Sequence, residues 1–221
     1  MAEPKRPLHS DPEFRIQTST ELREVIPAPP ELLQQKVFSE LVEEAQEFIA
    51  AAPLIMLCTS DAQGCMDVSP KGDALGFVEI TDKHTLTIPD RPGNRLAFGF
   101  NNLLQSSALS LIFLHPGTRE TLRVNGQGFI TKDPKVLERL AVGGKPALLA
   151  TEVQVDECFF HCGKALIRSK AWQPDSWGEP IKISFGKQFA KRMPAQDAAS
   201  EQALAEQIDA SVDDDYRNNL Y

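Results

Sequence analysis

The sequence predicts a mainly β protein, a small antiparallel β-barrel with flanking helices. About six short segments read as strands, and they follow one another at close spacing with few helices between them. Several neighbouring segments are separated only by short turns, which can join antiparallel strands but cannot form the crossover that parallel strands need. A doubly wound parallel sheet is therefore not expected, because it requires a helix after nearly every strand.

The composition indicates an ordinary globular protein. The 221 residues are 42% hydrophobic and 24% charged, which is enough for one full core. The formal net charge of −8 argues against nucleic acid or an anionic membrane as a general partner. No signal peptide is visible, the longest apolar run is too short to span a bilayer, and cysteines are sparse. We therefore expect a cytoplasmic protein with free thiols.

Three regions are expected along the chain. Residues 1–30 are rich in proline and charge and are predicted to form an N-terminal arm. Residues 31–172 contain all the strand-like segments and are predicted to form the barrel domain. Residues 173–221 are polar and acidic, with a helical stretch near 195–210, and are predicted to be a partly helical C-terminal extension.

The first half of the barrel domain opens with a helix. Apolar residues recur at spacings of three and four from Glu31 to Ala51, which predicts an amphipathic helix. Asp61 to Gly64 forms a turn between two strands, so these strands are expected to make a hairpin. The strands expected after the helix span 54–60, 66–69, 76–80 and 85–88.

The second half mixes helices with longer strands. Asn94 is expected to be the N-cap of a helix whose apolar face runs from Leu96 to Leu104. Asp133 and Pro134 are expected to begin a short helix, since proline is favoured at an early helical position. A further helix is expected over 161–171. The remaining strands are expected at 109–114, 119–131 and 147–160.

The turn from Thr87 to Arg95 is the strongest candidate for a binding site. It follows an apolar strand and combines a glycine with two arginines before a predicted helix. A helix N-terminus offers unpaired N–H groups and partial positive charge, and Gly93 allows an oxyanion to approach closely. Arg91 and Arg95 can add charge-assisted hydrogen bonds. These features predict a phosphate site, and the alternative is an ordinary turn with two solvated arginines, since no full dinucleotide or P-loop fingerprint is present.

Two other groups of residues have both a functional and an ordinary interpretation. Lys71 would add a charge to the same anion if its strand end meets the Arg91 turn, and otherwise it is a simple loop lysine. Four polar side chains share one face of the strand at 119–131 and are compatible with a cleft, a dimer seam or a solvated face. They are Arg119, Thr121, Arg123 and Asn125.

Metal and hydrolytic sites are not predicted. Cys158, His161 and Cys162 are close in sequence, but a closed zinc site needs four ligands and no second cluster accompanies them. No defensible Ser-His-Asp order or pair of glutamates is present. We therefore nominate no catalytic residue.

Together, these residues resemble the FMN-binding split-barrel family related to pyridoxamine 5′-phosphate oxidase, and within it a bacterial subgroup of oxidase-like flavoproteins. The resemblance runs from about Glu31 to Trp172. The segments that carry it are 59–64 (TSDAQG), 67–73 (DVSPKGD), 88–95 (IPDRPGNR), 119–126 (RETLRVNG) and 159–165 (FFHCGKA).

The resemblance implies a six-stranded antiparallel split barrel, a homodimer with FMN at the interface, and a small-molecule substrate. The FMN phosphate would be held by Lys71, Arg91, Asn94 and Arg95. The ribityl chain and ring would lie along Ser69, Thr87, Ile88 and Pro89, and Arg123 would approach from the partner strand. The leading hypothesis is an FMN-dependent oxidoreductase in which a cation, Lys71 or Arg123, stabilises the reduced flavin.

The chain also departs from the oxidases proper. Those enzymes carry further basic and aromatic residues near the C-terminus that recognise the substrate phosphate, and this pattern is not found after Trp172. Oxidation of pyridoxamine phosphate is therefore not expected. The alternative is a non-enzymatic protein that binds flavin, haem or another tetrapyrrole, with His161 as the first haem ligand to test. A deazaflavin in place of FMN also stays open.

Overall fold

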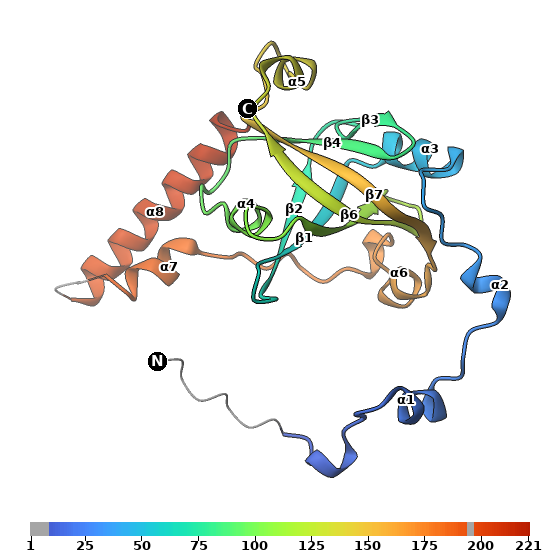
Figure 1. The fold of residues 1–221 in the computed structure, drawn as a ribbon. Helices are drawn as coiled ribbons and strands as arrows, with labels where there is room; N and C mark the ends of the chain where they lie inside the picture. The colour runs from blue at the N-terminus through green and yellow to red at the C-terminus, as the bar shows by residue number, and fades with distance from the viewer. Residues whose placement is uncertain (1–8, 194–196) are drawn as a thin grey trace. The chain divides into compact units, whose positions relative to one another are not determined.

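The computed structural model describes residues 9–193 and 197–221, and the chain divides into two compact units between Lys36 and Val37 (Figure 1). Residues 9–36, the described part of the first unit, contain three short helical segments and are all exposed. These segments are η1 (Pro12–Phe14), α1 (Ser19–Val25) and α2 (Glu31–Gln34). Residues 1–8 of the predicted arm lie outside the described residues, so the arm at 1–30 and the other two domain bounds stay predictions.

The second unit is built around one antiparallel sheet of seven strands in the order β2-β1-β5-β6-β7-β4-β3. The strands are β1 (Leu54–Ser60), β2 (Met66–Gly72), β3 (Glu79–Asp82), β4 (Thr85–Asp90), β5 (Ala108–Leu114), β6 (Thr121–Thr131) and β7 (Leu149–His161). The helices are α3 (Glu43–Ala51), α4 (Phe98–Leu103), α5 (Pro134–Arg139), α6 (Lys164–Ser169), the 3-10 helix η2 (Pro174–Ser176), α7 (Phe185–Ala190) and α8 (Ala198–Asn218).

The predicted class is confirmed at the level of a mainly β antiparallel sheet with flanking helices, but the strand count and the closure are wrong. The sheet has seven strands instead of six. The segments expected one by one already number seven, and the strand expected at 76–80 is β3, which is shifted to Glu79–Asp82, pairs with β4 and is half exposed. Within residues 9–193 and 197–221, no ladder joins the edge strands β2 and β3, so the sheet is not a closed barrel.

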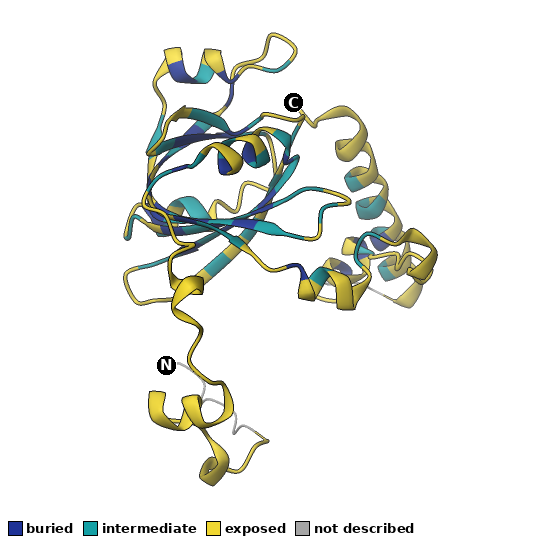
Figure 2. Cartoon of the chain, turned by 90° about the vertical axis from the view of Figure 1, so that its right-hand side faces the viewer, coloured by how far each residue is buried: buried dark blue, intermediate teal, exposed yellow. Residues whose placement is uncertain are grey.

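The core lies between the sheet and α3. Burial alternates strictly along β1 and β5, which places every second side chain in the core. Phe113 of β5 pairs with Ile55 of β1 on one side and with Leu122 of β6 on the other, and all three are fully buried. Figure 2 shows that buried residues, in dark blue, gather in the sheet, while α8 is mostly exposed. The apolar alternation in the sequence is thus satisfied by a single main core.

The helix expected from Glu31 to Ala51 is interrupted. α2 ends at Gln34 and α3 begins only at Glu43. Between them, Phe38 exchanges two hydrogen bonds with Cys158 of β7, at 3.0 and 2.8 Å, and the Leu41 N–H donates to the Lys83 carbonyl at 2.7 Å. These bonds to distant strands take the place of the hydrogen bonds that a helix would make. The apolar residues between α2 and α3 therefore keep a helical spacing in the sequence, although the backbone there is not helical.

The last two helices pack closely against each other. A Cβ at Gly186 of α7 would overlap the backbone of Ala205 in α8, so only glycine permits this approach. The Asp209 carboxylate accepts hydrogen bonds from the Ser184 hydroxyl at 2.6 Å and from the Gly186 N–H at 2.8 Å. α8 covers the stretch predicted to be helical near 195–210, of which 195–196 lie outside the described residues.

Among the helices in residues 9–193 and 197–221, none is both long and apolar enough to cross a bilayer.

Candidate functional site

A cavity of about 550 Å³ lies beside the ends of β2 and β4. Its wall is formed by β2, by the end of β4, by the loop 91–97 that follows, and by the start of α4. This volume is within the range of small-molecule and cofactor pockets. Six of the nine residues predicted to bind the cofactor line it, namely Ser69, Lys71, Pro89, Arg91, Asn94 and Arg95.

Two ion pairs hold the strand ends together at this cavity. Lys71 Nζ lies 2.7 Å from Asp90 Oδ1, and Arg91 Nε lies 2.8 Å from Asp73 Oδ2. β2 is an edge strand and β4 lies next to the other edge, so the sheet order gives them no ladder of their own. Side chains therefore bridge the two strand ends. Lys71 lies beside the Arg91 turn, which is the condition that the sequence set for its place in the predicted anion site.

Asp73 is the most enclosed charged group of the cavity. Its side chain is only 1% exposed. Besides the bond from Arg91, it accepts hydrogen bonds from the Tyr221 hydroxyl and the Ala74 N–H, both at 2.8 Å. Burial raises the pKa of Asp73, but the hydrogen bonds from Arg91, Tyr221 and Ala74, together with the positive charge of Arg91, outweigh burial and hold the pKa below its ordinary value of 3.8. Asp73 is therefore a carboxylate at neutral pH and is not suited to be a general acid.

The lowered pKa of Asp73 predicts a pH-dependent contribution to stability. Because its pKa is lower in the folded than in the unfolded chain, the contribution is present above 3.8 and is lost as the pH falls through the folded value. We expect the difference in free energy of unfolding between the wild type and Asp73→Asn to shrink as the pH is lowered from 5 to about 3. Urea denaturation at each pH measures it. A difference that stayed constant over this range would contradict the assignment.

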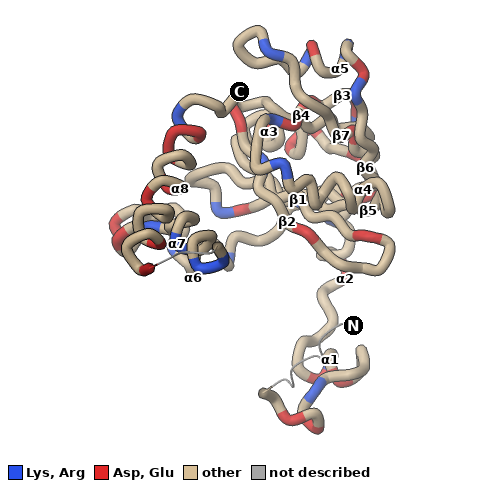
Figure 3. Tube along the Cα trace, turned by 90° about the vertical axis from the view of Figure 1, so that its left-hand side faces the viewer, with Lys and Arg blue, Asp and Glu red and all other residues tan. Residues whose placement is uncertain are grey.

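The cations of the cavity are balanced by acids. Lys71, Arg91 and Arg95 line it together with Asp67, Asp73 and Asp90, so the wall is formally neutral. The prediction from the sequence considered only the positive charges and did not include these acids. Figure 3 shows the same intermixing, with basic and acidic segments interspersed through the sheet. The paired acids fix the positions of Lys71 and Arg91, while Arg95 is exposed and has no ion pair among the residues described.

The loop between β4 and α4 differs from the predicted helix N-terminus. α4 begins at Phe98 and not after Asn94, and the Asn94 side chain accepts a hydrogen bond from the Leu96 N–H at 3.0 Å inside the loop. Arg95 and Ala97 have left-handed backbones, with φ of 61° and 53°. The expected N-cap is therefore wrong, because these two residues turn the chain once more before the helix starts. An anion here would be bound by loop groups and side chains.

Three predicted residues lie away from the cavity wall. Thr87 and Ile88 are buried in β4, where the Thr87 hydroxyl lies 3.3 Å from that of Thr81. The guanidinium of Arg123 in β6 lies 5.5 Å from the centre of the Phe159 ring. None of the three is among the lining residues, so this chain by itself does not bring them to the predicted ligand.

The Cys158, His161 and Cys162 cluster does not converge on one point. Cys158 is buried, and burial raises the pKa of its thiol to about 11. His161 and Cys162 are exposed at the end of β7 and beyond it. In the parts of the chain that the structure describes, no three His, Cys, Asp or Glu side chains are grouped to hold a metal ion. His161 is also absent from the wall of the cavity.

Sequence reasoning missed four residues of the site. Asp73 and Asp90 lie inside the two motifs that predicted the anion site, and their place beside Lys71 and Arg91 was the available signal. Phe100 contacts Lys71, whose Nζ lies 5.4 Å from the ring centre. Tyr221 reaches Asp73 from 148 residues away, and no local pattern indicates that contact.

Comparison with known proteins gives one family match. The model of the pyridoxamine 5′-phosphate oxidase family matches residues 41–162, which include every wall residue discussed above. A search of curated proteins found no match.

Solved structures give further likenesses, all distant. One is a protein from Clostridium acetobutylicum related to general stress protein 26 of B. subtilis, of the pyridoxinephosphate oxidase family, at 16% identity over 54% of this chain and 86% of that one, with a TM-score of 0.40. An FMN-binding protein from Syntrophomonas wolfei is 10% identical over 52% of this chain and 86% of its own, with a TM-score of 0.39. HutZ, the haem storage protein from Vibrio cholerae, is 14% identical over 55% of this chain and 94% of its own, with a TM-score of 0.38.

Proposed function

The chain belongs to the pyridoxamine 5′-phosphate oxidase family, and on that premise we propose that it is a flavoprotein that binds FMN and oxidises or reduces a small molecule. The observation that carries the proposal is the convergence of Lys71, Arg91 and Arg95 on one cavity of about 550 Å³. These cations come from two segments of the chain that are separate in sequence and that both lie within the family match. Phe77, Phe98 and Phe100 also line the cavity and suit a flat aromatic ligand.

The phosphate of FMN would be bound by the loop after β4. Arg91 gives its Nε to Asp73, so its two terminal nitrogens are oriented for a bidentate contact with a phosphate. Arg95 and the amide of Asn94 would add donors from the same loop. Ser69 and Pro89, on the facing strand ends, would lie along the rest of the ligand. This arrangement uses only groups that already line the cavity.

Lys71 is the candidate for a role in the chemistry. FMN supplies the redox chemistry when bound, and the protein supplies binding, orientation and charge. The Lys71 ammonium is held between Asp90 and the Phe100 ring, so it is a fixed positive charge beside any ligand in the cavity. Such a charge would stabilise negative charge on the reduced flavin. Arg123 could take this part only if it came from a partner subunit, since it lies outside the cavity of its own chain.

We also propose a homodimer with the cofactor at the interface. Val68, Leu96 and Phe98 line the cavity, yet each is more than half exposed in the single chain. Apolar side chains grouped around a binding site are covered in many proteins by a partner surface. A second copy would cover them and complete the wall of the cavity. Sedimentation equilibrium with and without FMN measures the oligomeric state.

Replacing Arg95 with alanine is expected to weaken FMN binding by about 1.5–3 kcal/mol, because a charge-assisted hydrogen bond to the phosphate is lost. Titration followed by flavin fluorescence measures the affinity. Riboflavin, which lacks the phosphate, should bind the wild type more weakly than FMN and should be insensitive to the substitution. Arg168→Ala, at an exposed arginine of α6, is the matched control and should bind FMN as the wild type does.

The same titration tests the proposed function as a whole. A purified protein that was colourless and took up no FMN would overturn it. A haem or tetrapyrrole binder is the alternative, and a Soret band that disappears in His161→Ala would support that alternative. Turnover of NADPH with an added acceptor would support the enzyme over a protein that only stores the cofactor.

A further inference from the structure

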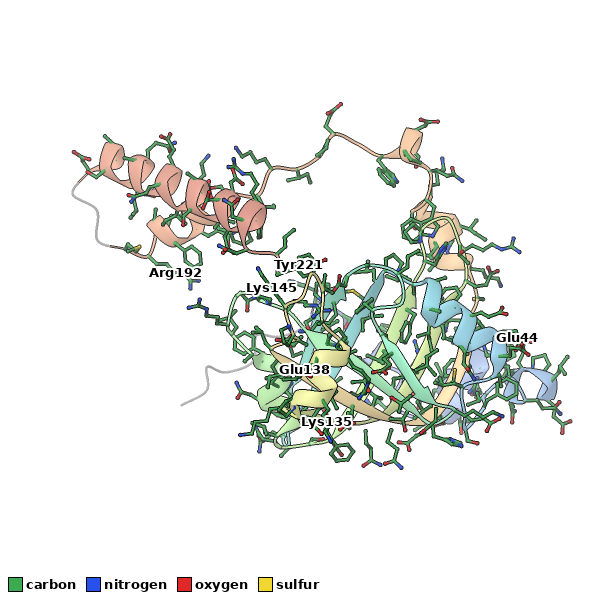
Figure 4. All side chains as sticks on the ribbon, turned by 90° about the horizontal axis from the view of Figure 1, so that it is seen from above. Glu44, Lys135, Glu138, Lys145, Arg192 and Tyr221 are labelled. Atoms are coloured by element: carbon green, nitrogen blue, oxygen red, sulfur yellow. The ribbon has the colours of Figure 1, made fainter. Side chains whose placement is uncertain are left out.

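Tyr221 contacts both members of the buried Asp73–Arg91 pair. Its hydroxyl donates to Asp73 Oδ1 at 2.8 Å, and its ring centre lies 6.0 Å from the guanidinium carbon of Arg91. The main-chain oxygen of Tyr221 accepts a hydrogen bond from Lys145 Nζ at 2.8 Å. Figure 4 shows Tyr221 and Lys145 beside each other where the chain returns from α8 to the sheet. Three separate contacts therefore attach the segment after α8 next to the cavity.

These contacts fix the orientation of the Arg91 guanidinium. Asp73 holds the Nε edge, and the Tyr221 ring lies near the guanidinium at cation–π distance. The Asp73 hydrogen bond, and then its negative charge, raise the pKa of Tyr221, so the phenol stays protonated and keeps donating. A guanidinium held by two groups in this way loses less conformational freedom when it binds a phosphate.

We propose that Tyr221 is a positioning residue for the anion site: it orients Arg91, through Asp73 and through its own ring, toward the phosphate of the ligand. This inference rests on the proposed binding of FMN. By linkage, docking of the Tyr221 segment and binding of the phosphate then favour each other equally. The site of a ligand in the sheet would thus be coupled to the end of α8, a helix that packs on α7.

The end of α8 is suited to such coupling because acidic residues are concentrated there. Asp213, Asp214 and Asp215 lie near its C-terminal end, where negative charge opposes the helix dipole, and Arg217 is the single basic residue of the last turn. The contacts of Tyr221 offset part of this cost. Ligand binding that strengthens them is therefore expected to order the last turns of α8.

The test compares FMN and riboflavin binding in the full-length wild type and three variants. Tyr221→Ala should bind FMN about three- to tenfold more weakly, which corresponds to a coupling of 0.6–1.4 kcal/mol. Its affinity for riboflavin should be unchanged, because only the phosphate contact depends on Arg91. Tyr221→Phe, which keeps the ring and loses the hydroxyl, should have an FMN affinity between those of the wild type and Tyr221→Ala. Tyr216→Ala removes the chain's other tyrosine, exposed on α8, and should match the wild type.

Hydrogen–deuterium exchange gives a second measurement. Saturating FMN should slow exchange of the amides in the last turns of α8 and beyond in the wild type, and should have no such effect in Tyr221→Ala. Equal FMN affinity of the wild type and Tyr221→Ala, or equal losses for FMN and riboflavin, would overturn the positioning role while leaving FMN binding established. Failure of the wild type to bind FMN would overturn the proposed function and this inference with it.

Discussion

Replacing Arg91 with alanine is expected to lower the free energy of unfolding by about 3 kcal/mol, independently of any ligand. The substitution leaves the Asp73 carboxylate, 1% exposed, without its ion-pair partner. Its hydrogen bonds from Tyr221 and Ala74 remain and keep the loss at the lower end of the range for a broken buried pair. Urea denaturation followed by tryptophan fluorescence measures the change.

Arg119→Ala is the matched control for this substitution. The Arg119 Nε lies 2.8 Å from a Glu120 oxygen, the same separation as in the Arg91–Asp73 pair, but its side chain is 68% exposed. An exposed pair of this kind contributes less than about 1 kcal/mol. Equal losses in the two variants would show that burial of the Arg91–Asp73 pair has no energetic consequence. The comparison therefore isolates burial, with the distance held constant.

Phe113→Ala is expected to destabilise the fold by about 3–5 kcal/mol, through lost apolar burial and the cavity left behind. Phe113 is fully buried on β5, between Ile55 and Leu122 on the neighbouring strands. The neighbours belong to paired strands and cannot collapse into the space. Chemical denaturation measures the loss, with the slope of the transition checked for a change in the unfolded state.

Phe129 on β6 supplies the comparison, because its side chain is 51% exposed. Phe129→Ala should change the free energy of unfolding by no more than about 0.5 kcal/mol, as is typical for surface positions. If the two phenylalanines cost the same, the assignment of the core to this face of β5 would be wrong. In a dimer that buried Phe129, its effect would grow with protein concentration.

The sheet could be predicted because its signals are local. β1 alternates buried and half-buried residues along its whole length, and the turn at 61–64 joins it directly to β2. The Asp133-Pro134 start of α5 is likewise confirmed, with the Asp133 carboxylate accepting from the Lys135 N–H at 2.9 Å. Each of these features depends on residues within a few positions of one another, so the sequence pattern contains the necessary information.

The parts that could not be predicted depend on distant contacts. The helical period across 31–51 is a local signal, and the backbone bonds of Phe38 to Cys158 overrode it. At the cavity, the motifs located the cations, but the acids that neutralise them pair across 18 and 19 residues. The contact of Tyr221 with Asp73 spans 148 residues and depends on the course of the whole chain after β7. Composition and local spacing do not indicate which residues far apart in the sequence come into contact.

The left-handed backbone of Arg95 sets stability against function at one residue. An L-residue in that conformation costs roughly 1 kcal/mol relative to glycine, which adopts it freely. Glycine at this position would relieve the cost but would remove the cavity's exposed guanidinium. A laboratory selection for thermal tolerance alone would therefore favour losing the arginine, whereas a selection for ligand retention would keep it. Position 95 is thus a place where the two kinds of selection would drive the sequence in opposite directions.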